Sequence, residues 1–264
     1  MIMARRVALN GVWLDEIDSR IFISGVEPGD GKENITAVDS AAGYGQRITA
    51  RWRQTMDIII RFRMLEHGKN VTGLTERALL LERVNGWAQA GGYLTLNYKP
   101  NRRLNVVLVQ PPGEGSLWDY TKEFSLTFRA YAIPYWEDEN ALSVTFGGAS
   151  ASGSRSVSIE GSAKTQCDVE LANTSGMTIN SCRVVIGGNT MTFSGLGLGG
   201  SEALVIDHAD GLLRIRIRNG GSYRSVMAAR SGADDYKVTP GVQTCSFSAD
   251  RACRMTVSWR CRYL

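Results

Sequence analysis

The side chains best suited to acid–base or metal chemistry are scarce in this sequence of 264 residues. The two histidines, His67 and His208, each stand beside a probable turn, so we expect exposed turn residues rather than general bases. The five cysteines are odd in number and form no Cys-x-x-Cys pair, which fits neither a zinc site nor a fully paired disulfide framework. We therefore predict no catalytic residue, no metal site and no cofactor. The thiols are expected to be reduced and to pack as small apolar groups: Cys167, Cys182, Cys245, Cys253 and Cys261.

One glycine-rich run has the form of a phosphate-binding motif. Gly195 to Gly200 satisfies Gly-x-Gly-x-x-Gly, but a dinucleotide site needs a strand before the motif and a helix after it. The strand-like Leu204-Val205-Ile206 follows instead, so we interpret the run as a glycine-rich β-turn. Asp207 to Gly211 lacks the alternating oxygen ligands and distal glutamate of a calcium loop, and it predicts a hairpin turn.

Two features could support binding rather than catalysis. Arg214, Arg216 and Arg218 alternate with apolar residues, so they could contact phosphates or an acidic protein, or form a solvated sheet face that discourages edge aggregation. Trp259 and Tyr223 are candidates for stacking on a sugar ring. The net charge of +4 is too small to indicate a nucleic-acid binder, and we expect none.

The elements that must position these residues are mostly strands. The sequence has 29 glycines but only 6 prolines, a composition typical of many short strands and tight turns. The second half offers about eight strand candidates separated by turns, which is typical of a β-sandwich. Its last strand, Met255 to Tyr263, alternates cleanly and places Trp259 on one face.

The first half is also rich in predicted strands, and it contains one convincing helix. Asn10-Gly11 indicates a hairpin, residues 27–46 an extended loop, and residues 46–66 strands. The helix is expected to begin after an N-cap at Thr75 and to end at Gly91-Gly92, with Arg77 largely off its apolar stripe of Leu80, Val84 and Trp87. Its simplest role is to cap a sheet or barrel, with partner-helix binding as the alternative.

The domain boundary is expected after the strand that ends near Trp136, giving domains 1–138 and 139–264. No targeting segment is visible at the start of the sequence. The longest uncharged stretch, Val184 to Ser201, is interrupted by many glycines and polar residues, so we expect no membrane insertion.

The order of these features resembles the distal tail (Dit) proteins of long-tailed phages and prophages along essentially the whole chain. The most specific piece is the strand 123–128 running into Ile133-Pro134-Tyr135-Trp136-Glu137. Val242-Gln243 departs from the family, in which Asn usually follows the Pro-Gly turn. The other matching segments are Gly43 to Arg47, the strand pair 48–53 and 56–62, the helix through Leu80 to Val84, the turn region 235–244 and the terminal strand 257–264.

The resemblance implies a mainly β fold, with an N-terminal β-barrel-like domain carrying one helix and a C-terminal galectin-like β-sandwich. It implies a non-enzymatic structural protein of the virion tail tip, or baseplate, assembled in the host cytoplasm. The N-terminal domains would form a homo-oligomeric ring, commonly a hexamer. This ring would join the tail tube protein to the tail-associated hub or fibre protein, with receptor-binding proteins around the outside. The alternative function is a carbohydrate-binding β-sandwich module that contributes to host-surface attachment.

Overall fold

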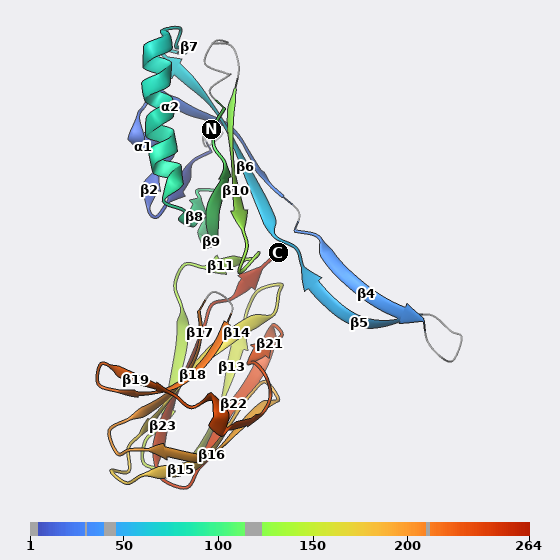
Figure 1. Cartoon of the computed structure of the whole chain (residues 1–264), viewed down its shortest axis with the longest axis vertical. Helices are drawn as coiled ribbons and strands as arrows, with labels where there is room; N and C mark the ends of the chain where they lie inside the picture. The colour runs from blue at the N-terminus through green and yellow to red at the C-terminus, as the bar shows by residue number, and fades with distance from the viewer. Residues whose placement is uncertain (1–4, 30, 40–45, 114–122, 210–211) are drawn as a thin grey trace. The chain divides into compact units, whose positions relative to one another are not determined.

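The protein is mainly β, as the sequence predicts, and its chain falls into two compact units, Met1–Trp136 and Glu137–Leu264 (Figure 1). The computed structural model describes residues 5–29, 31–39, 46–113, 123–209 and 212–264. Residues 43–45 of the family-like segment and Asp210-Gly211 of the predicted turn lie outside the described residues. No helix within the described ranges is long and apolar enough to cross a membrane.

The first unit is built on one antiparallel sheet. The predicted hairpin at Asn10-Gly11 is present, and both residues adopt positive φ, at 51° and 83°. No pairing between the outermost strands closes the sheet into a barrel within the described residues. The strand order is β2 (Val12–Trp13), β1 (Val7–Leu9), β8 (Gly92–Leu96), β9 (Lys99–Gln110), β10 (Phe124–Ala130), β6 (Met56–Glu66) and β3 (Ile21–Pro28), and β7 (Lys69–Asn70) pairs with β6.

Helix α2 (Leu74–Gln89) packs against this sheet through the predicted stripe. Leu80 and Val84 are buried, and the Trp87 ring meets the edge of Phe128 at 6.0 Å between centroids. Two details of the prediction are wrong. The N-cap is Gly73 rather than Thr75, and Arg77 is buried, with its guanidinium over the Phe124 ring at 5.4 Å.

A second, short helix was also missed. Helix α1 (Leu14–Ile17) follows directly after β2, where the sequence analysis predicted no helix. Asp18, which ends α1, ion-pairs with Arg20 and with Arg83 of α2 at 2.9 Å each, and these charges lower the pKa of Asp18 to about 2. The ion pairs therefore connect the end of α1, the residue before β3 and α2 at one point.

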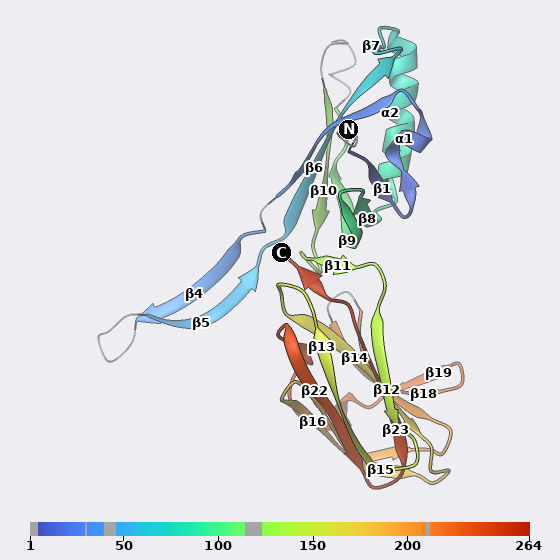
Figure 2. The ribbon, with the colours of Figure 1, turned by 180° about the vertical axis from the view of Figure 1, so that it is seen from behind.

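The predicted loop over residues 27–46 is wrong. The described part of this segment forms β4 (Glu33–Asp39), which pairs with β5 (Gln46–Arg53) as a two-stranded ribbon, hereafter the arm. The arm continues the β3–β6 pairing, since the Gly29 amide donates to the Asp57 carbonyl at 2.6 Å and Gln54 to Lys32 at 2.8 Å. In both views it extends beyond the sheet (Figures 1 and 2).

The second unit is the predicted β-sandwich, in which two antiparallel sheets enclose one apolar core. The first sheet, hereafter the charged sheet, has the order β12 (Leu142–Gly147), β23 (Cys253–Trp259), β14 (Thr165–Asn173), β17 (Ala203–Ala209), β18 (Leu212–Asn219) and β19 (Ser222–Ser225), with β21 (Lys237–Val238) beside β14. The second sheet, hereafter the hydroxyl sheet, has the order β13 (Ser152–Ile159), β22 (Gly241–Ala249), β15 (Ile179–Ile186), β16 (Asn189–Leu198) and β20 (Arg230–Gly232). The short elements β11 (Trp136–Asp138), η2 (Met227–Ala229) and β24 (Arg262–Tyr263) complete the described chain.

Asn173 fixes one end of this sandwich. Its buried side-chain amide donates to the carbonyls of Met177 at 2.6 Å, Leu198 at 3.0 Å and Gly199 at 3.0 Å, while its oxygen accepts from Ser175. One side-chain amide therefore satisfies backbone groups from two segments of the chain, residues 175–177 and 198–199.

Replacing Asn173 with aspartate should lower the free energy of unfolding by about 3 kcal/mol, because a carboxylate would face three carbonyl oxygens. Chemical denaturation monitored by tryptophan fluorescence measures this change. The same substitution at the exposed Asn140 is the control and should change the free energy by less than about 0.5 kcal/mol. Equal effects at the two positions would contradict the stabilising role of the Asn173 side-chain amide.

Candidate interaction surfaces and a buried polar network

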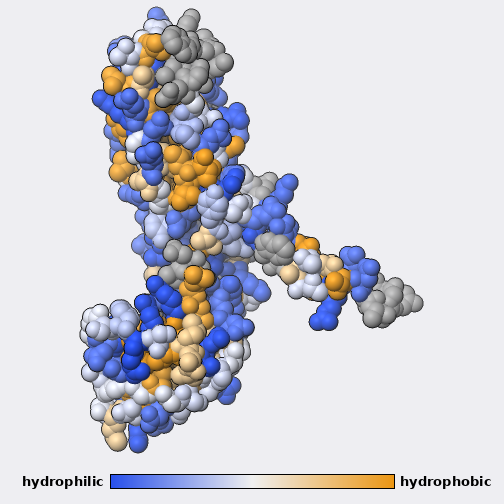
Figure 3. Space-filling view, in the orientation of Figure 1, coloured by the Kyte–Doolittle hydropathy of each residue, from blue (hydrophilic) through white to orange (hydrophobic). Residues whose placement is uncertain are grey.

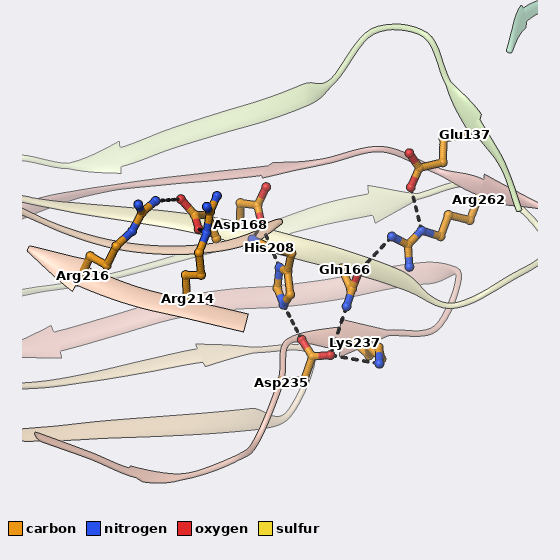
Figure 4. A network of polar contacts seen from close by, with 10 residues as sticks. Glu137, Gln166, Asp168, His208, Arg214, Arg216, Asp235, Lys237 and Arg262 are labelled. Carbon is orange, nitrogen blue, oxygen red and sulfur yellow. Dashed lines mark hydrogen bonds and ion pairs between the residues drawn. The ribbon is translucent and has the colours of Figure 1, made fainter. Parts of the chain in front are cut away.

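His208 lies within a partly buried network of polar contacts in the second unit (Figure 4). Its Nδ1 lies 2.8 Å from a carboxylate oxygen of Asp168 on β14, and its Nε2 lies 2.7 Å from Asp235, in the segment before β21. The side chain of His208 is 7% exposed, against 47% for Asp168 and 22% for Asp235. The prediction of a surface turn residue is therefore wrong: His208 is on strand β17, in the inward register of Leu204 and Ile206.

The environment of His208 favours the imidazolium form. Burial alone lowers the pKa of His208, but the hydrogen bonds to Asp168 and Asp235 outweigh it and raise the pKa to about 9. For Asp235, burial raises the pKa, and hydrogen bonds from His208, Gln166 and Lys237 more than reverse this and hold it well below its usual range. At neutral pH both ring nitrogens therefore donate, one to each carboxylate.

The network extends from His208 to the first and last strands of the second unit. Gln166 donates to Asp235 at 3.2 Å and accepts from Arg262 at 2.8 Å, and Arg262 in turn donates to Glu137 at 2.9 Å. The side chains of Arg262 and Glu137 are 9% and 12% exposed. Among the described residues, both partners of the His208 ring nitrogens are carboxylates, so the imidazole links β14 to the segment before β21.

The arginines of β18 are neutralised by acidic residues on neighbouring strands. Asp207 on β17 accepts from Arg214 at 2.9 Å and from Arg216 at 2.5 Å, and Glu170 on β14 accepts from Arg218 at 2.6 Å. The sequence analysis left open a solvated sheet face or a binding face, and the structure adds that these partly exposed arginines are ion-paired within the sheet.

Removing the acidic partners of these arginines should strengthen the binding of the protein to polyanions. Combining Asp207→Asn with Glu170→Gln should raise the salt concentration at which the protein elutes from heparin. The plot of log binding constant against log salt concentration should steepen by the equivalent of about two more charge contacts. Combining Glu139→Gln with Glu160→Gln removes the same charge from exposed positions elsewhere and should leave elution nearly at the native value. Identical elution of the two double variants would contradict this account.

The glycine-rich run is not a phosphate site in this structure. Residues 195–198 belong to the end of β16, and only the residues after Leu198 form the predicted turn into β17. The Gly199 amide, which a phosphate would need, donates to the carboxylate of Glu202 at 2.7 Å. The carboxylate therefore occupies the place of an anionic ligand.

The two aromatic candidates for sugar stacking are not available as expected. Trp259 is 7% exposed and belongs to the sandwich core, so its prediction as a stacking residue is wrong. Tyr223 is 51% exposed on β19, but the Arg216 guanidinium lies 4.5 Å from its ring centroid and covers one face.

All five cysteines are free and buried, and burial raises the pKa of Cys182 and Cys253 to about 12, which makes these thiols unreactive.

Metal-binding geometry is likewise missing from the part of the chain that the structure describes, where no three His, Cys, Asp or Glu side chains cluster as potential ligands.

The surface of the first unit carries exposed apolar and aromatic side chains (Figure 3). Tyr93 on β8 and Tyr131 directly after β10 are 39% and 53% exposed and lie beside the guanidinium groups of Arg103 and Arg129. Tyrosine and arginine are enriched in protein interfaces.

The arm is the second apolar surface of this unit. Ile35, Val38 and Ile48 are each half exposed on a ribbon that has no core of its own. Two-stranded ribbons are marginal in water unless another surface covers them. The arm is therefore a candidate contact for a partner protein.

Comparison with solved structures gives matches that cover both units. A crystal structure of the Dit protein of phage SPP1 matches with a TM-score of 0.66 over 99% of this chain and 100% of that chain, at 14% sequence identity. This chain has the fold of SPP1 Dit. The SPP1 protein is described as a paradigm of the hub adsorption apparatus in phages that infect Gram-positive bacteria.

Two chains from structures of the phage p2 baseplate in its activated conformation, with Ca and with Sr, also match. Both have 9% identity and a TM-score of 0.48, and they cover 98% and 97% of this chain. No family model matches the sequence, and no curated protein matches it. The likeness to SPP1 Dit therefore lies in the fold, and it agrees with the family resemblance seen in the sequence.

Proposed function

We propose that this chain is a distal tail protein: a structural component of a phage tail tip. Copies of the first unit form a homo-oligomeric ring, most simply a hexamer, that connects the tail tube to the hub or fibre protein. Receptor-binding proteins attach around the outside. The observation that carries this proposal is the full-length fold match to SPP1 Dit, which spans both units of this chain and all of that one.

The surfaces of the first unit support ring formation. A closed ring requires two different surfaces on each copy, one complementary to the other. The arm offers the half-exposed side chains of Ile35, Val38 and Ile48, and the sheet offers Tyr93 and Tyr131 among arginines. Contact between the arm of one copy and the first unit of the next would cover both surfaces.

The buried chemistry supports a structural role rather than an enzymatic one. The residue with the strongest potential for acid–base catalysis, His208, has both ring nitrogens committed to carboxylates. The five free, buried thiols fit assembly in a reducing compartment, which in a phage life cycle is the host cytoplasm. The proposed location of the finished protein is the tail tip of the virion.

Immunogold electron microscopy tests the proposed location. Particles are produced from the phage or prophage that carries this gene and labelled with antibodies against the full chain. We expect gold at the tail end opposite the capsid. Label along the whole tail, on the capsid, or only in unassembled protein would contradict the proposal.

A further inference from the structure

The outer face of the hydroxyl sheet has an unusual composition. The side chains that alternate with buried Val157, Val184 and Phe247 on its strands are mostly serine and threonine. The register places them in rows across the strands. One row consists of Ser152, Ser248, Arg183, Thr192 and Ser231. In the next row, Ser246 lies between Ser154 and Val185.

This composition belongs to one face and is not general to the sandwich. The outer face of the charged sheet carries acidic Glu170 and Asp207 and a column of arginines joined in ion pairs. The outer residues of the two rows on the hydroxyl sheet include one charged side chain, Arg183, and no carboxylate. Without the charged side chains that solvate the opposite face, the hydroxyl face has little electrostatic preference for an ionic partner.

A shallow depression lies within this face. It has a volume of about 250 Å³ and is lined by Arg183, Val185, Ser246, Phe247 and Ser248. Serine hydroxyls both donate and accept hydrogen bonds, and a guanidinium supplies several fixed donors. Val185 adds a partly exposed apolar contact between them.

The hydroxyls around the depression are available. Ser154, Ser246 and Ser248 make no side-chain hydrogen bond within the described chain, whereas Ser231 donates weakly to the Thr192 carbonyl at 3.4 Å. Short side chains such as serine also lose little rotamer entropy when a ligand orders them. Hydroxyl donors and acceptors around an apolar contact match a sugar ring, which presents hydroxyls at its edge and C–H groups on its faces.

We propose that this depression and the hydroxyl rows around it bind an uncharged polysaccharide. The arrangement favours a neutral polyol over a protein partner, because serine is depleted in protein interfaces and no aromatic or other large apolar anchor is exposed in the rows. This site is distinct from the predicted stacking residues Trp259 and Tyr223, and its existence does not depend on ring formation.

Native affinity electrophoresis of the full chain tests the proposal. The gels contain dextran, mannan, galactan or β-1,3-glucan as neutral probes, with polygalacturonate as the charged counterpart. We expect at least one neutral probe to retard the protein. Arg183→Ala should weaken that retardation about tenfold by removing a charged donor. Ser248→Glu should abolish it, because the new carboxylate would pair with Arg183 and close the depression.

Ser143→Glu is the matched control, since it places the same charge at an exposed hydroxyl position on the charged sheet. It should leave retardation unchanged, and circular dichroism should show all variants folded. The proposal is overturned if no neutral probe retards the protein, if only polygalacturonate does, or if Arg183→Ala and Ser248→Glu bind as the native chain does. A change in oligomeric state caused by Ser248→Glu, without any polysaccharide binding by the native chain, would assign the face to a protein partner instead.

Discussion

Substituting His208 with alanine is expected to lower the free energy of unfolding of the second unit by about 3 kcal/mol. The substitution leaves Asp235, whose side chain is 22% exposed, without its imidazolium partner, and it opens a gap between β17 and the segment before β21. Calorimetry of the full chain should show one transition moved to lower temperature. His67→Asn is the control, because His67 is an exposed turn residue with φ of 49°, a conformation that asparagine tolerates.

The same pair of proteins should differ in how stability depends on pH. The pKa of His208 is raised from 6.5 to about 9 in the folded state, so its contribution is fully present below pH 6.5 and is lost as the pH rises through 9. The stability difference between native protein and His208→Ala should therefore shrink by about 2 to 3 kcal/mol over that range. Cysteine thiols in the unfolded chain also begin to ionise near pH 8.5. This contribution is the same in the native protein and in His208→Ala, so it cancels in the difference between their free energies of unfolding. A difference that stays constant with pH would show that His208 is not charged in the folded protein.

Replacing Ile35, Val38 and Ile48 together with serine is expected to abolish self-assembly. These three side chains are 54%, 50% and 55% exposed on the arm, so they contribute little to the packing of their own chain. Losing three apolar contacts at each interface should weaken it by about 3 to 5 kcal/mol, which is more than a hundredfold in the dissociation constant. Analytical ultracentrifugation measures the shift from oligomer to monomer.

The control for the arm variant is an equally apolar set placed elsewhere. Leu142, Met177 and Val242 are 46%, 56% and 76% exposed on the second unit, and their replacement with serine should leave the oligomer intact. Both variants should keep the unfolding temperature of the native chain within about 2 °C. An arm variant that assembles normally would show that the arm is not the ring contact.

The regular strands were predictable because burial imposes a period of two on them. The terminal strand is an example: Met255, Val257 and Trp259 are buried as its alternation predicts. The sequence predicted β5 within the strands of residues 46–66 but missed its partner β4, whose residues are exposed or half-buried with no buried alternation and lie in a glycine-rich and acidic segment that resembles a loop. Pairing to each other, and not burial, makes these residues strands.

The network around His208 could not be predicted from local pattern. Asp168 and Asp235 are 40 and 27 residues away from His208 along the chain, and only the sandwich topology brings them together. One signal was present: Leu204, Ile206 and His208 continue a single alternation, which places the imidazole on the inward side of β17. Arg77 was misjudged for a related reason, since the Phe124 ring that covers it belongs to a strand 47 positions later in the sequence (124 − 77).

The hydroxyl face shows the reverse case, in which the sequence pattern was visible but its meaning was not. Serine alternates along Ser152-Gly153-Ser154-Arg155-Ser156-Val157-Ser158, and the structure shows that this segment is strand β13. Only the register shows that β13, β22 and β16 place their hydroxyls in shared rows, with Arg183 and Val185 of β15 between them.

The mass of the purified full-length protein tests the central claim most directly. Light scattering coupled to size-exclusion chromatography gives the mass, and negative-stain electron microscopy of the same fraction gives the shape. We predict discrete closed rings of uniform subunit number, most simply six copies of the 28.9 kDa chain. A species of 28.9 kDa at every concentration that the protein tolerates would contradict a function built on repeated contacts between copies.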